Sequence, residues 1–578
     1  DGPCRKGIKA GRTHRKPVSR FFNIVMIRPF ILLFALTASL PADESIRQAG
    51  DARFWLRVPA DRAPLTGIHV SSGSIDAANW EKDPAVRQRL TDVTFPIRWW
   101  SWSGCSITFT PVEDETVEIA LNGPWTGDKD GKPFRQEILW DGVQASGATI
   151  TNGGFETESS NAPDSWKPLY GPYLPAGSWP LAGAAALEGK SMAATWHDRP
   201  LGQSIEVKAG QTVTITFHAK AATPPGFISP KLLGKNTPAH KAASGIKRGV
   251  NLGNCWEAPP PYSWGIRFAP EDIDRIAAEG FDHIRVPVAW HFYLKNAGSV
   301  PEIDPALLTD LEPVLRRALE KNMRVLLDWH HFDALTDNPA AKREQFVKVW
   351  ETLTRHFKSW PPGLYFELLN EPRDALTTEV ANPIYADTIA AIRRIDAERI
   401  IFVSPGNWGS ISELEKLRLP DNDDRLVVTV HCYDPFYFTH QKAGWVQLGD
   451  LEGLTYPGPP KTPLQIPASL QENAGLRNFI ERYNTLPAAQ NPCSQNVVRE
   501  LLDLARDWSE HFGRPVHLGE FGSHDTGDAG SRVRYCRDVR TLAEARGIPW
   551  TLWEWKAGFR YWDSRKNETK LKEALFGG

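Results

Sequence analysis

The chain has two regions with different hydrophobic periodicities. Between residues 45 and 222, short segments such as 106–110, 116–121 and 212–217 alternate apolar and polar positions and are rich in β-branched and aromatic residues. Alternation with a period of two is typical of strands that bury one face, and clusters of turn residues separate these segments. The region is therefore predicted to form an antiparallel β-sandwich.

From residue 245 to 578 the pattern changes to apolar strands followed by amphipathic helices. The predicted strands cover residues 247–253, 283–288, 324–330, 364–371, 399–405, 426–433, 515–520 and 549–555. Eight successive strand–helix units predict the α/β class and a TIM (β/α)8 barrel. Residues 223–244, rich in Pro, Gly and Lys, are predicted to link the two domains, and the long loop at about 434–490 to shape a substrate site.

The segment before residue 45 is predicted to be a targeting sequence. Residues 30–40 are apolar but too few to cross a bilayer, with Arg28 before them and Pro41-Ala42 after them. This pattern predicts a signal peptide at 26–42 and a secreted or periplasmic protein that is not attached to a membrane once the signal is removed. Residues 1–25 are basic and do not begin with Met, and we interpret them as upstream translation.

The composition indicates a neutral ligand. The net charge is only -2, which gives no electrostatic reason to expect nucleic acid or acidic lipid as a partner. Tryptophan occurs 23 times, and its flat apolar ring with one polar group suits a pyranose ring. We therefore expect a monomer that binds a neutral glycan.

Cysteine usage gives no indication of a metal or another cofactor. Five of the six Cys residues follow the predicted signal peptide, and none has a CxxC or Cys/His spacing. They are expected to be buried apolar residues with at most one or two disulfide bonds.

The run Asp128-Lys-Asp130-Gly131 is similar to a calcium loop, but its twelfth position is Leu139 instead of Glu, so a hairpin turn is expected.

Polar and aromatic residues gather at the ends of the predicted barrel strands. Active sites of such barrels lie at the C-terminal ends of the strands. The residues expected there are Arg285, His330, His331, Asn370, Glu371, His431, Tyr433, Glu520 and Trp553. Six of the eight strands thus deliver a polar or aromatic group to one rim.

Glu371 and Glu520 form a pair of carboxylates on separate strands. A pair at one rim suits hydrolysis of a glycosidic bond, with retention of configuration if the carboxyl groups lie about 5 to 5.5 Å apart. Repulsion between the two raises the pKa of the acid, while a guanidinium such as Arg285 holds the nucleophile ionised. We therefore assign Arg285 to Glu520.

Six strings in the predicted barrel resemble glycoside hydrolase family 5, the cellulase family of a barrel-fold glycosidase clan. They are Gly249-Val-Asn-Leu-Gly-Asn254, Phe281-Asp-His-Ile-Arg285-Val-Pro, Leu368-Leu-Asn-Glu371-Pro, His431-Cys-Tyr433-Asp-Pro, Gly519-Glu520-Phe-Gly and Trp550-Thr-Leu-Trp553-Glu-Trp. Asn-Glu-Pro alone is shared across the clan, but the six strings together, in this order and spacing, are specific. The resemblance covers about residues 245–578.

The resemblance implies a role for each residue that matches the family's motifs. It implies that Glu371 is the acid/base, that Glu520 is the nucleophile and that Asn370 binds the 2-hydroxyl of the sugar. Arg285 and Tyr433 would position the nucleophile. His431 would sit beside the acid/base, His330 would contact the sugar at the cleaved bond, and Trp553 would form the floor of that subsite. His331 remains an alternative to His330.

Several departures and extra tryptophans concern substrate preference. Phe559-Arg560 follows the eighth strand where such enzymes often have Phe-Gly, and Cys255-Trp256 follows the first strand where other residues are usual. The segment from Phe438 to Trp445 resembles a sequence common in bacterial members. The candidates for outer sugar subsites are Trp256, Trp290, Trp408 and Trp445.

The predicted sandwich resembles a jelly-roll carbohydrate-binding module. The resemblance rests on Asn152-Gly-Gly-Phe155-Glu, on Trp166 and on Gly210 to Lys220, while Leu139 to Val143 looks like that module's closing strand placed first. The module would then be permuted. Trp99, Trp100 and Trp102 either bind glycan or belong to the sandwich core.

Together these observations predict an exported, retaining endo-β-1,4-glucanase that needs no cofactor. Other retaining β-glycanases of the same fold, acting on mannan, xyloglucan or β-1,3-glucan, are alternatives, as are a transglycosylase and a barrel that binds glycan without cleaving it. The intact pair of Glu residues argues against the non-catalytic alternative.

Overall fold

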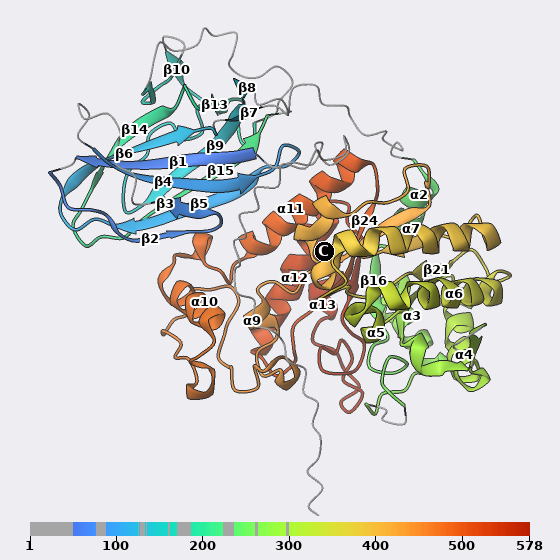
Figure 1. Ribbon diagram of the computed structural model, residues 1–578. Helices are drawn as coiled ribbons and strands as arrows, with labels where there is room; N and C mark the ends of the chain where they lie inside the picture. The colour runs from blue at the N-terminus through green and yellow to red at the C-terminus, as the bar shows by residue number, and fades with distance from the viewer. Residues whose placement is uncertain are drawn as a thin grey trace, which may run out of the picture.

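The computed structural model describes most of the chain from residue 50 onward (Figure 1). The described residues are 50–59, 61–76, 88–124, 126–127, 133–134, 136–159, 162–169, 186–222, 236–260, 264–295 and 300–577. The predicted signal peptide at 26–42, the preceding residues 1–25 and the turn at Asp128 to Gly131 lie outside the described residues.

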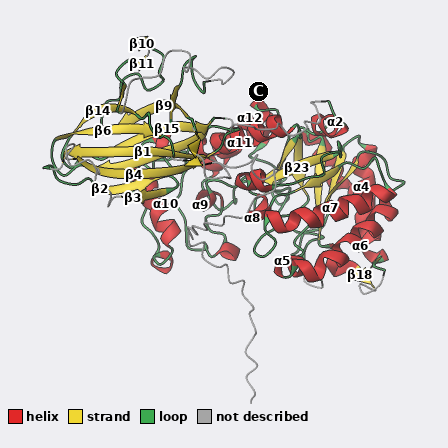
Figure 2. Ribbon diagram, turned by 45° about the horizontal axis from the view of Figure 1, so that its top comes forward, coloured by secondary structure: helices red, strands yellow, loops and turns green. Residues whose placement is uncertain are grey.

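The N-terminal domain is a sandwich of two antiparallel sheets, as predicted (Figure 2). One sheet has the order β12 (Lys167–Pro168), β14 (Leu201–Val207), β6 (Glu115–Asn122), β1 (Gly50–Pro59), β4 (Gln88–Ile97) and β3 (Ser74–Asp76). The other has the order β13 (Ala193–Thr195), β9 (Ile138–Ser146), β15 (Val213–Ala221), β5 (Ser103–Thr110) and β2 (Thr66–Val70). Short pairs are formed by β7 (Thr126–Gly127) with β8 (Pro133–Phe134) and by β10 (Glu158–Ser159) with β11 (Ala162–Pro163).

The alternating sequence pattern places the sandwich core between the two sheets. Along β5, every second side chain is buried, including Ile107 and Phe109. Phe217 of β15 stacks on Phe54 of β1, with ring centroids 5.1 Å apart, and meets Phe95 of β4 edge to face at 5.2 Å. Aromatic contacts between the sheets thus hold the sandwich together.

The C-terminal domain is a closed barrel of eight parallel strands, which confirms the predicted fold. The strands are β16 (Arg248–Asn251), β17 (His283–Val288), β20 (Arg324–Trp329), β21 (Leu364–Glu367), β22 (Ile401–Val403), β23 (Leu426–His431), β24 (Val516–Phe521) and β25 (Trp550–Leu552). A small hairpin, β18 (Leu294–Lys295) with β19 (Glu302–Ile303), follows β17.

Helices cover the outside of the barrel (Figure 1). The long helices are α3 (Pro270–Glu279), α4 (Pro305–Glu320), α6 (Pro339–Phe357), α7 (Thr378–Ile395), α11 (Gln495–Phe512) and α12 (Ala529–Ala545). Shorter ones are α5 (Asp333–Asp337), α8 (Gly406–Gly409) and α13 (Lys572–Phe576). In the described residues, no helix is both long and apolar enough to cross a membrane.

The stretch predicted as a linker, 223–244, contains a helix at its end. This helix, α2 (Pro238–Ser244), begins after Thr237, whose hydroxyl accepts a hydrogen bond from the backbone N–H of His240 at 3.3 Å. A capping Thr followed by Pro is a favourable helix start. Ala239 and Ala242 share a small apolar cluster with barrel residues such as Leu326, so α2 belongs to the barrel rather than to a linker.

The long loop after β23 is a folded insertion. It contains α9 (Phe436–Thr439), α10 (Ala474–Thr485) and short 3-10 turns. Tyr456 and Tyr483 are fully buried within it, and the Tyr456 hydroxyl donates to Asp538 of α12 at 2.9 Å. The insertion is therefore fastened to the barrel and has a defined shape.

All five described cysteines are free and buried. Burial raises the pKa of the thiols of Cys255 and Cys536 to about 11, so both remain protonated. They act as small apolar residues, as expected, and none of the five takes part in a disulfide bond.

Two tryptophans of the sandwich pack against the barrel domain. Trp99 meets His511 edge to face at 4.6 Å, and Trp100 meets Phe512 at 6.2 Å; both partners lie in α11. Nearby, the Ser101 hydroxyl donates to Asp507 at 2.7 Å. Because Trp99 and Trp100 are buried at this interface, they have no free ring face for a glycan, whereas Trp102 is only partly buried.

Replacing Trp99 by Ala is expected to weaken the attachment of the sandwich to the barrel. Truncating a buried aromatic residue costs about 3 kcal/mol or more. Chemical denaturation should therefore show a clear loss of stability for Trp99→Ala and little change for the control Trp264→Ala, whose ring is 54% exposed. Equal stability of the two variants would contradict the interface.

Candidate active site

The structure brings all eight residues predicted for the site to the C-terminal rim of the barrel or to the strand ends just below it. Arg285, His431 and Glu520 lie within β17, β23 and β24. The other five follow strand ends: His330, Asn370, Glu371, Tyr433 and Trp553. Since parallel strands all end at one edge of a barrel, residues separated by up to 268 positions can meet there.

Arg285 is the centre of the site. Its side chain is fully buried and donates to both carboxylate oxygens of Glu367, at 2.8 and 2.7 Å. It also donates to Oε1 of Glu520 at 2.8 Å and to the side-chain oxygens of Asn251 and Asn370 at 2.9 and 2.8 Å. The assignment of Arg285 to Glu520 is thus only part of its role.

Asp328 and Glu367 were not expected from the sequence. Asp328 lies 3.1 Å from Arg285, and both carboxyl groups are fully buried. Burial raises the pKa of Glu367, and it raises the pKa of Asp328 to about 7, while Arg285 opposes both shifts. The signal that could have revealed them is an acidic residue inside an otherwise apolar strand, as in Leu-Leu-Asp328-Trp and Tyr-Phe-Glu367-Leu.

The carboxyl group of Glu520 accepts hydrogen bonds from two side chains. Arg285 donates to Oε1, and the hydroxyl of Tyr433 donates to Oε2 at 2.8 Å. Burial raises the pKa of Glu520 to about 7, while His431, Arg285 and the Tyr433 hydroxyl act against this shift. The two donors favour the ionised form, which a nucleophile needs.

Glu371 follows Asn370 in a turn at the rim, where its own φ is 48°. One of its oxygens lies 2.8 Å from Nδ1 of His431. Burial raises the pKa of Glu371 to about 7, with Arg373 and Arg285 opposing the shift. The donors bound to Glu520 include the Arg285 cation, whereas Asn370, which hydrogen-bonds Glu371, is a neutral amide, so a proton shared between the two carboxyl groups is expected on Glu371.

The two carboxyl groups are close neighbours. One oxygen of Glu371, one oxygen of Glu520 and one nitrogen of His431 all lie within 4.8 Å of one another. This spacing would also allow a metal ion, but Arg285 is already hydrogen-bonded to Glu520, and a second cation there would be repelled. The arrangement better suits a pair of catalytic carboxyl groups.

His330 and Trp553 form an aromatic wall beside the carboxyl pair. Their rings are stacked, with centroids 5.6 Å apart and an angle of 7° between their planes. Nδ1 of His330 donates to Asp328 at 2.7 Å, so its Nε2 accepts from Asn370 at 3.4 Å. Trp553 also lies against Gly253, where a Cβ atom would be only 2.8 Å from the ring.

His331 lies beside His330 but is held differently. Its φ is 52°, and its Nδ1 lies 3.5 Å from the Asn370 amide. Burial lowers the pKa of both His330 and His331 well below the ordinary value. Only His330 stacks on Trp553, so the geometry favours His330 as the residue beside the sugar.

The four candidate outer tryptophans fall into two groups. Trp256 and Trp290 are fully buried, and Trp256 donates to Asp310 at 2.8 Å, so the expectation that these two contact sugar is wrong. Trp408 is 40% exposed and lies beside the Glu371 turn, because its backbone N–H donates to the carbonyl of Pro372. Trp445 is 58% exposed on the long insertion. Sequence position alone does not show which way an indole points.

The unusual Phe559-Arg560 pair lies next to the rim, where Phe559 packs against rim residues and both carbonyl oxygens bind Arg532. Phe559 is buried and packs against Tyr433 and His440, with ring centroids 5.8 and 5.3 Å away. The carbonyl oxygens of both Phe559 and Arg560 accept from the Arg532 guanidinium. Phe559 therefore helps to place Tyr433, while Trp445 lies on its outer side at 6.3 Å.

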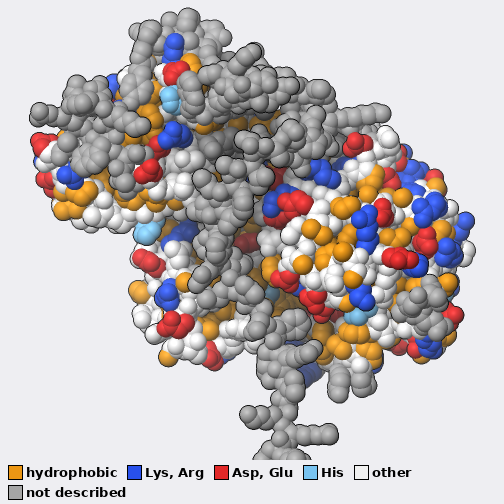
Figure 3. Space-filling model, viewed as in Figure 1, with side chains coloured by type: hydrophobic (Ala, Val, Ile, Leu, Met, Phe, Trp, Pro, Cys, Tyr) orange, Lys and Arg blue, Asp and Glu red, His pale blue; other side chains and the backbone are white. Residues whose placement is uncertain are grey.

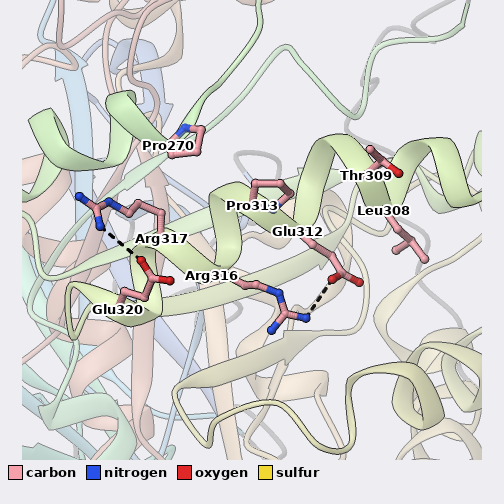
Figure 4. A pocket seen from close by; sticks show the side chains of 8 residues that line it. All are labelled: Pro270, Leu308, Thr309, Glu312, Pro313, Arg316, Arg317 and Glu320. Carbon is pink, nitrogen blue, oxygen red and sulfur yellow. Dashed lines mark hydrogen bonds and ion pairs between the residues drawn. The ribbon is translucent and has the colours of Figure 1, made fainter.

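A separate depression of about 460 Å³ lies on the outer wall of the barrel at α4 (Figure 4). Its charged residues pair with one another, as Arg316 does with Glu312 and Arg317 with Glu320. No charge is left to bind a ligand in this group of residues. The convergent polar groups of the rim make a better candidate site.

Replacing Arg285 by Met is expected to destabilise the barrel strongly. The change leaves Asp328, Glu367 and Glu520 buried without their cation, which costs about 3 to 5 kcal/mol. Urea denaturation at pH 7 measures this loss. The control Arg343→Met breaks an exposed pair with Asp387 and should cost less than about 1 kcal/mol; comparable losses would contradict the central role of Arg285.

Comparison with known proteins places this site in a family. The family model for cellulase (glycosyl hydrolase family 5) matches residues 247–558. Endoglucanase 3 of Fibrobacter succinogenes is 26% identical over 366 residues, covering 60% of this chain and 55% of that protein. Endoglucanase C of Acetivibrio thermocellus is 28% identical over 330 residues, covering 54% of this chain and 91% of that protein.

Solved structures agree with this relationship. Thermotoga maritima Cel5A, in a mutant form in complex with cellobiose substrate, is 29% identical with a TM-score of 0.52, covering 59% of this chain and 100% of that chain. This chain spans only about half of the Fibrobacter relative, so the relationship concerns the barrel. The match to the family model covers more than half of the chain, and the chain belongs to glycosyl hydrolase family 5.

Proposed function

We propose that this protein is an endo-β-1,4-glucanase in which Glu371 is the acid/base and Glu520 the nucleophile. The observation that carries the proposal is the carboxyl pair, whose oxygens approach within 4.8 Å while only Glu520 is held by Arg285 and Tyr433. Retaining glycosidases place these groups about 5 to 5.5 Å apart, whereas inverting enzymes need about 6.5 Å or more.

The reaction takes place in two displacements. In the first, an oxygen of Glu520 bonds to the anomeric carbon while Glu371 gives its proton to the departing glycosidic oxygen. In the second, Glu371, now ionised, takes a proton from water as the water oxygen attacks the same carbon and releases Glu520. Glu371 and Glu520 then return to their starting protonation states.

The neighbouring side chains suit a sugar bound over this pair. The Asn370 amide is fixed by Arg285 and His330, so it is preorganised to hydrogen-bond a sugar 2-hydroxyl, an interaction that strengthens in the transition state. Trp553, backed by His330, offers a flat apolar face to the ring of the sugar. Tyr433 keeps Glu520 oriented for attack.

The choice of a β-1,4-glucan is supported by the relatives and by the surface. Several relatives are named endoglucanases, and the structures of Thermotoga maritima Cel5A include complexes with cellobiose and with mannotriose. Mannan is therefore the second candidate substrate. On the face shown in Figure 3, acidic and basic side chains are interspersed over the barrel, which suits a neutral polymer.

We further propose that the protein is exported and acts outside the cytoplasm. The support is the apolar run at 30–40 followed by Pro41-Ala42. A polymer substrate too large to enter a cell also favours this location.

Exposed Trp408 and Trp445 on the rim suit a chain that extends past the cleaved bond, as endo action requires.

Glu371→Gln and Glu520→Gln should each lose activity on carboxymethyl cellulose or barley β-glucan. Losing a general acid costs about a hundredfold to ten-thousandfold in rate, and losing the nucleophile removes the first step altogether. Release of reducing ends measures both, together with a panel that includes mannan and xyloglucan. The control Glu452→Gln changes a carboxylate of the long insertion that is paired with Lys442 and should stay fully active; normal activity in either Glu371→Gln or Glu520→Gln would refute the assignment.

Trp445→Ala should weaken binding of long chains specifically. Loss of one aromatic platform is expected to lower kcat/KM about tenfold for cellohexaose. An aryl β-cellobioside, which has only two sugar rings, should be cleaved as before, and Trp445→Phe, which keeps an aromatic ring, should retain most of the activity on cellohexaose. The same loss on both substrates would mean that Trp445 shapes the catalytic pair instead of an outer subsite.

A further inference from the structure

Strand β24, which carries Glu520, contains one residue more than the strands on either side of it. From Leu518 to Glu520 the ladder with β23 advances by two residues on β24 but by only one on β23. From Leu518 to Phe521 the ladder with β25 advances by three residues on β24 but by only two on β25. The first ladder passes over Gly519, so β24 has a β-bulge at this residue, directly before Glu520.

The bulge determines the face of β24 on which Glu520 lies. His517 points into the barrel, because its ring centroid is 5.7 Å from that of His283 on β17 and 5.4 Å from that of Phe402 on β22. Neither β17 nor β22 is next to β24 in the barrel. Glu520 also points inward, since it meets Arg285 of β17. Side chains alternate along a regular strand, so two residues three positions apart would lie on opposite faces. Without the extra residue, Glu520 would face the surrounding helices.

The bulge leaves no room for a side chain at Gly519. A Cβ atom there would collide with the hydroxyl oxygen of Thr429 and would lie 3.2 Å from Nε2 of His431. Both of these residues belong to β23. Glycine therefore allows β24 to pass close to β23 just before the nucleophile.

The side chain of Asn251, at the end of β16, is hydrogen-bonded to the bulge. It is fully buried, and its amide nitrogen donates to the carbonyl oxygen of Gly519 at 3.0 Å and to that of Leu552 at 3.2 Å. Its own side-chain oxygen accepts from Nη1 of Arg285 at 2.9 Å. These directions are certain, because a guanidinium can only donate and a backbone carbonyl can only accept.

The three groups that Asn251 contacts all adjoin the proposed nucleophile or the sugar subsite. Gly519 directly precedes Glu520, and Leu552 directly precedes Trp553. The guanidinium is the one that donates to Glu520. Because a bulged residue lies outside the regular ladder, a side-chain donor from a third strand supplies a hydrogen bond that fixes its position.

We infer that Asn251 is a positioning residue, which holds the bulge at Gly519 in place and thereby orients Glu520 for attack on the anomeric carbon. The inference rests on the proposed function, in which Glu520 is the nucleophile. Asn251 acts through Gly519 and Arg285 and does not itself contact the sugar. The first displacement should depend on it, since Glu520 bonds to carbon in that step.

Asn251→Leu tests the inference, because leucine has a similar size and cannot form any of the three hydrogen bonds. The probe is 2,4-dinitrophenyl 2-deoxy-2-fluoro-β-cellobioside. Glu520 bonds to its anomeric carbon as dinitrophenolate leaves, and the fluorine slows the second displacement, so the labelled enzyme accumulates. Dinitrophenolate needs no proton from Glu371, so the labelling rate reports the nucleophile alone.

Mass spectrometry of the intact protein gives both the rate constant and the final extent of labelling. A nucleophile displaced by about 1 Å loses about a hundredfold in rate, so the rate constant of Asn251→Leu should fall by about this factor while labelling still reaches completion. A purely structural role would lower the labelled fraction and leave the rate constant of the folded fraction unchanged. That result would overturn the inference.

Asn491→Leu is the matched control. Asn491 is also buried, donates to the carbonyl oxygens of Tyr483 and Leu486 at 2.8 and 3.1 Å, and accepts from the backbone N–H of Cys493 at 3.0 Å. All three bonds stay within residues 483–493. Asn491→Leu should therefore lose stability and keep the wild-type rate constant for labelling. An equal fall of the rate constant in both variants would overturn the specific role of Asn251.

The labelled wild-type enzyme gives a test that requires no variant to fold. In a crystal structure of the full chain with the sugar bonded to Glu520, the Asn251 amide should keep its contacts with the carbonyl oxygens of Gly519 and Leu552. Loss of these contacts, or a regular ladder through residue 519, would overturn the inference and leave the proposed function intact. Labelling of a residue other than Glu520 would instead overturn the proposed function.

Discussion

The whole rim depends on the balance between one buried cation and three buried carboxyl groups. Arg285 of β17 faces Asp328 of β20, Glu367 of β21 and Glu520 of β24, and all of these side chains are withdrawn from solvent. Such a group is costly to bury unless each charge is paired and hydrogen-bonded. The guanidinium meets that condition with bonds to Glu367, Glu520 and two asparagines.

The same balance explains why the two catalytic carboxyl groups differ. Glu367 accepts two parallel hydrogen bonds from the guanidinium. Glu520 accepts only one, so the positive charge of Arg285 is divided between the two carboxyl groups. The Tyr433 hydroxyl gives Glu520 a second hydrogen bond, and the ring of Phe559 packs against Tyr433. Glu371 is hydrogen-bonded to the neutral Asn370 amide instead of the guanidinium and has His431 as its neighbour, which suits a group that must both give and take a proton.

Much of the architecture could be predicted from the sequence because the barrel strands are apolar runs interrupted by polar residues at their ends. Those interruptions indicated Asn370, Glu371 and Glu520, whereas Arg285 lies inside its strand and was indicated by its motif Phe281-Asp-His-Ile-Arg285-Val-Pro. Asp328 and Glu367 escaped prediction because they face the barrel interior from within a strand, where a local pattern does not show that a cation on another strand balances them. Helix α2 was missed because its apolar contacts come from distant strands.

Tryptophan was the least informative residue in the sequence. Trp256 and Trp290 became core, and Trp99 and Trp100 became contacts with α11, because the direction of a side chain depends on tertiary packing. That packing gives the sandwich a structural role, since it holds the sandwich against the barrel. Whether the sandwich also binds glycan stays a prediction from its resemblance to a binding module.

The configuration of the first product tests the account most directly. Proton NMR during the first minutes of cellooligosaccharide hydrolysis distinguishes the two anomers before they interconvert. The close pair of Glu371 and Glu520 predicts that the β-anomer appears first and that the α-anomer grows in only by mutarotation. Initial formation of the α-anomer would contradict a covalent intermediate on Glu520 and the assignment of this site.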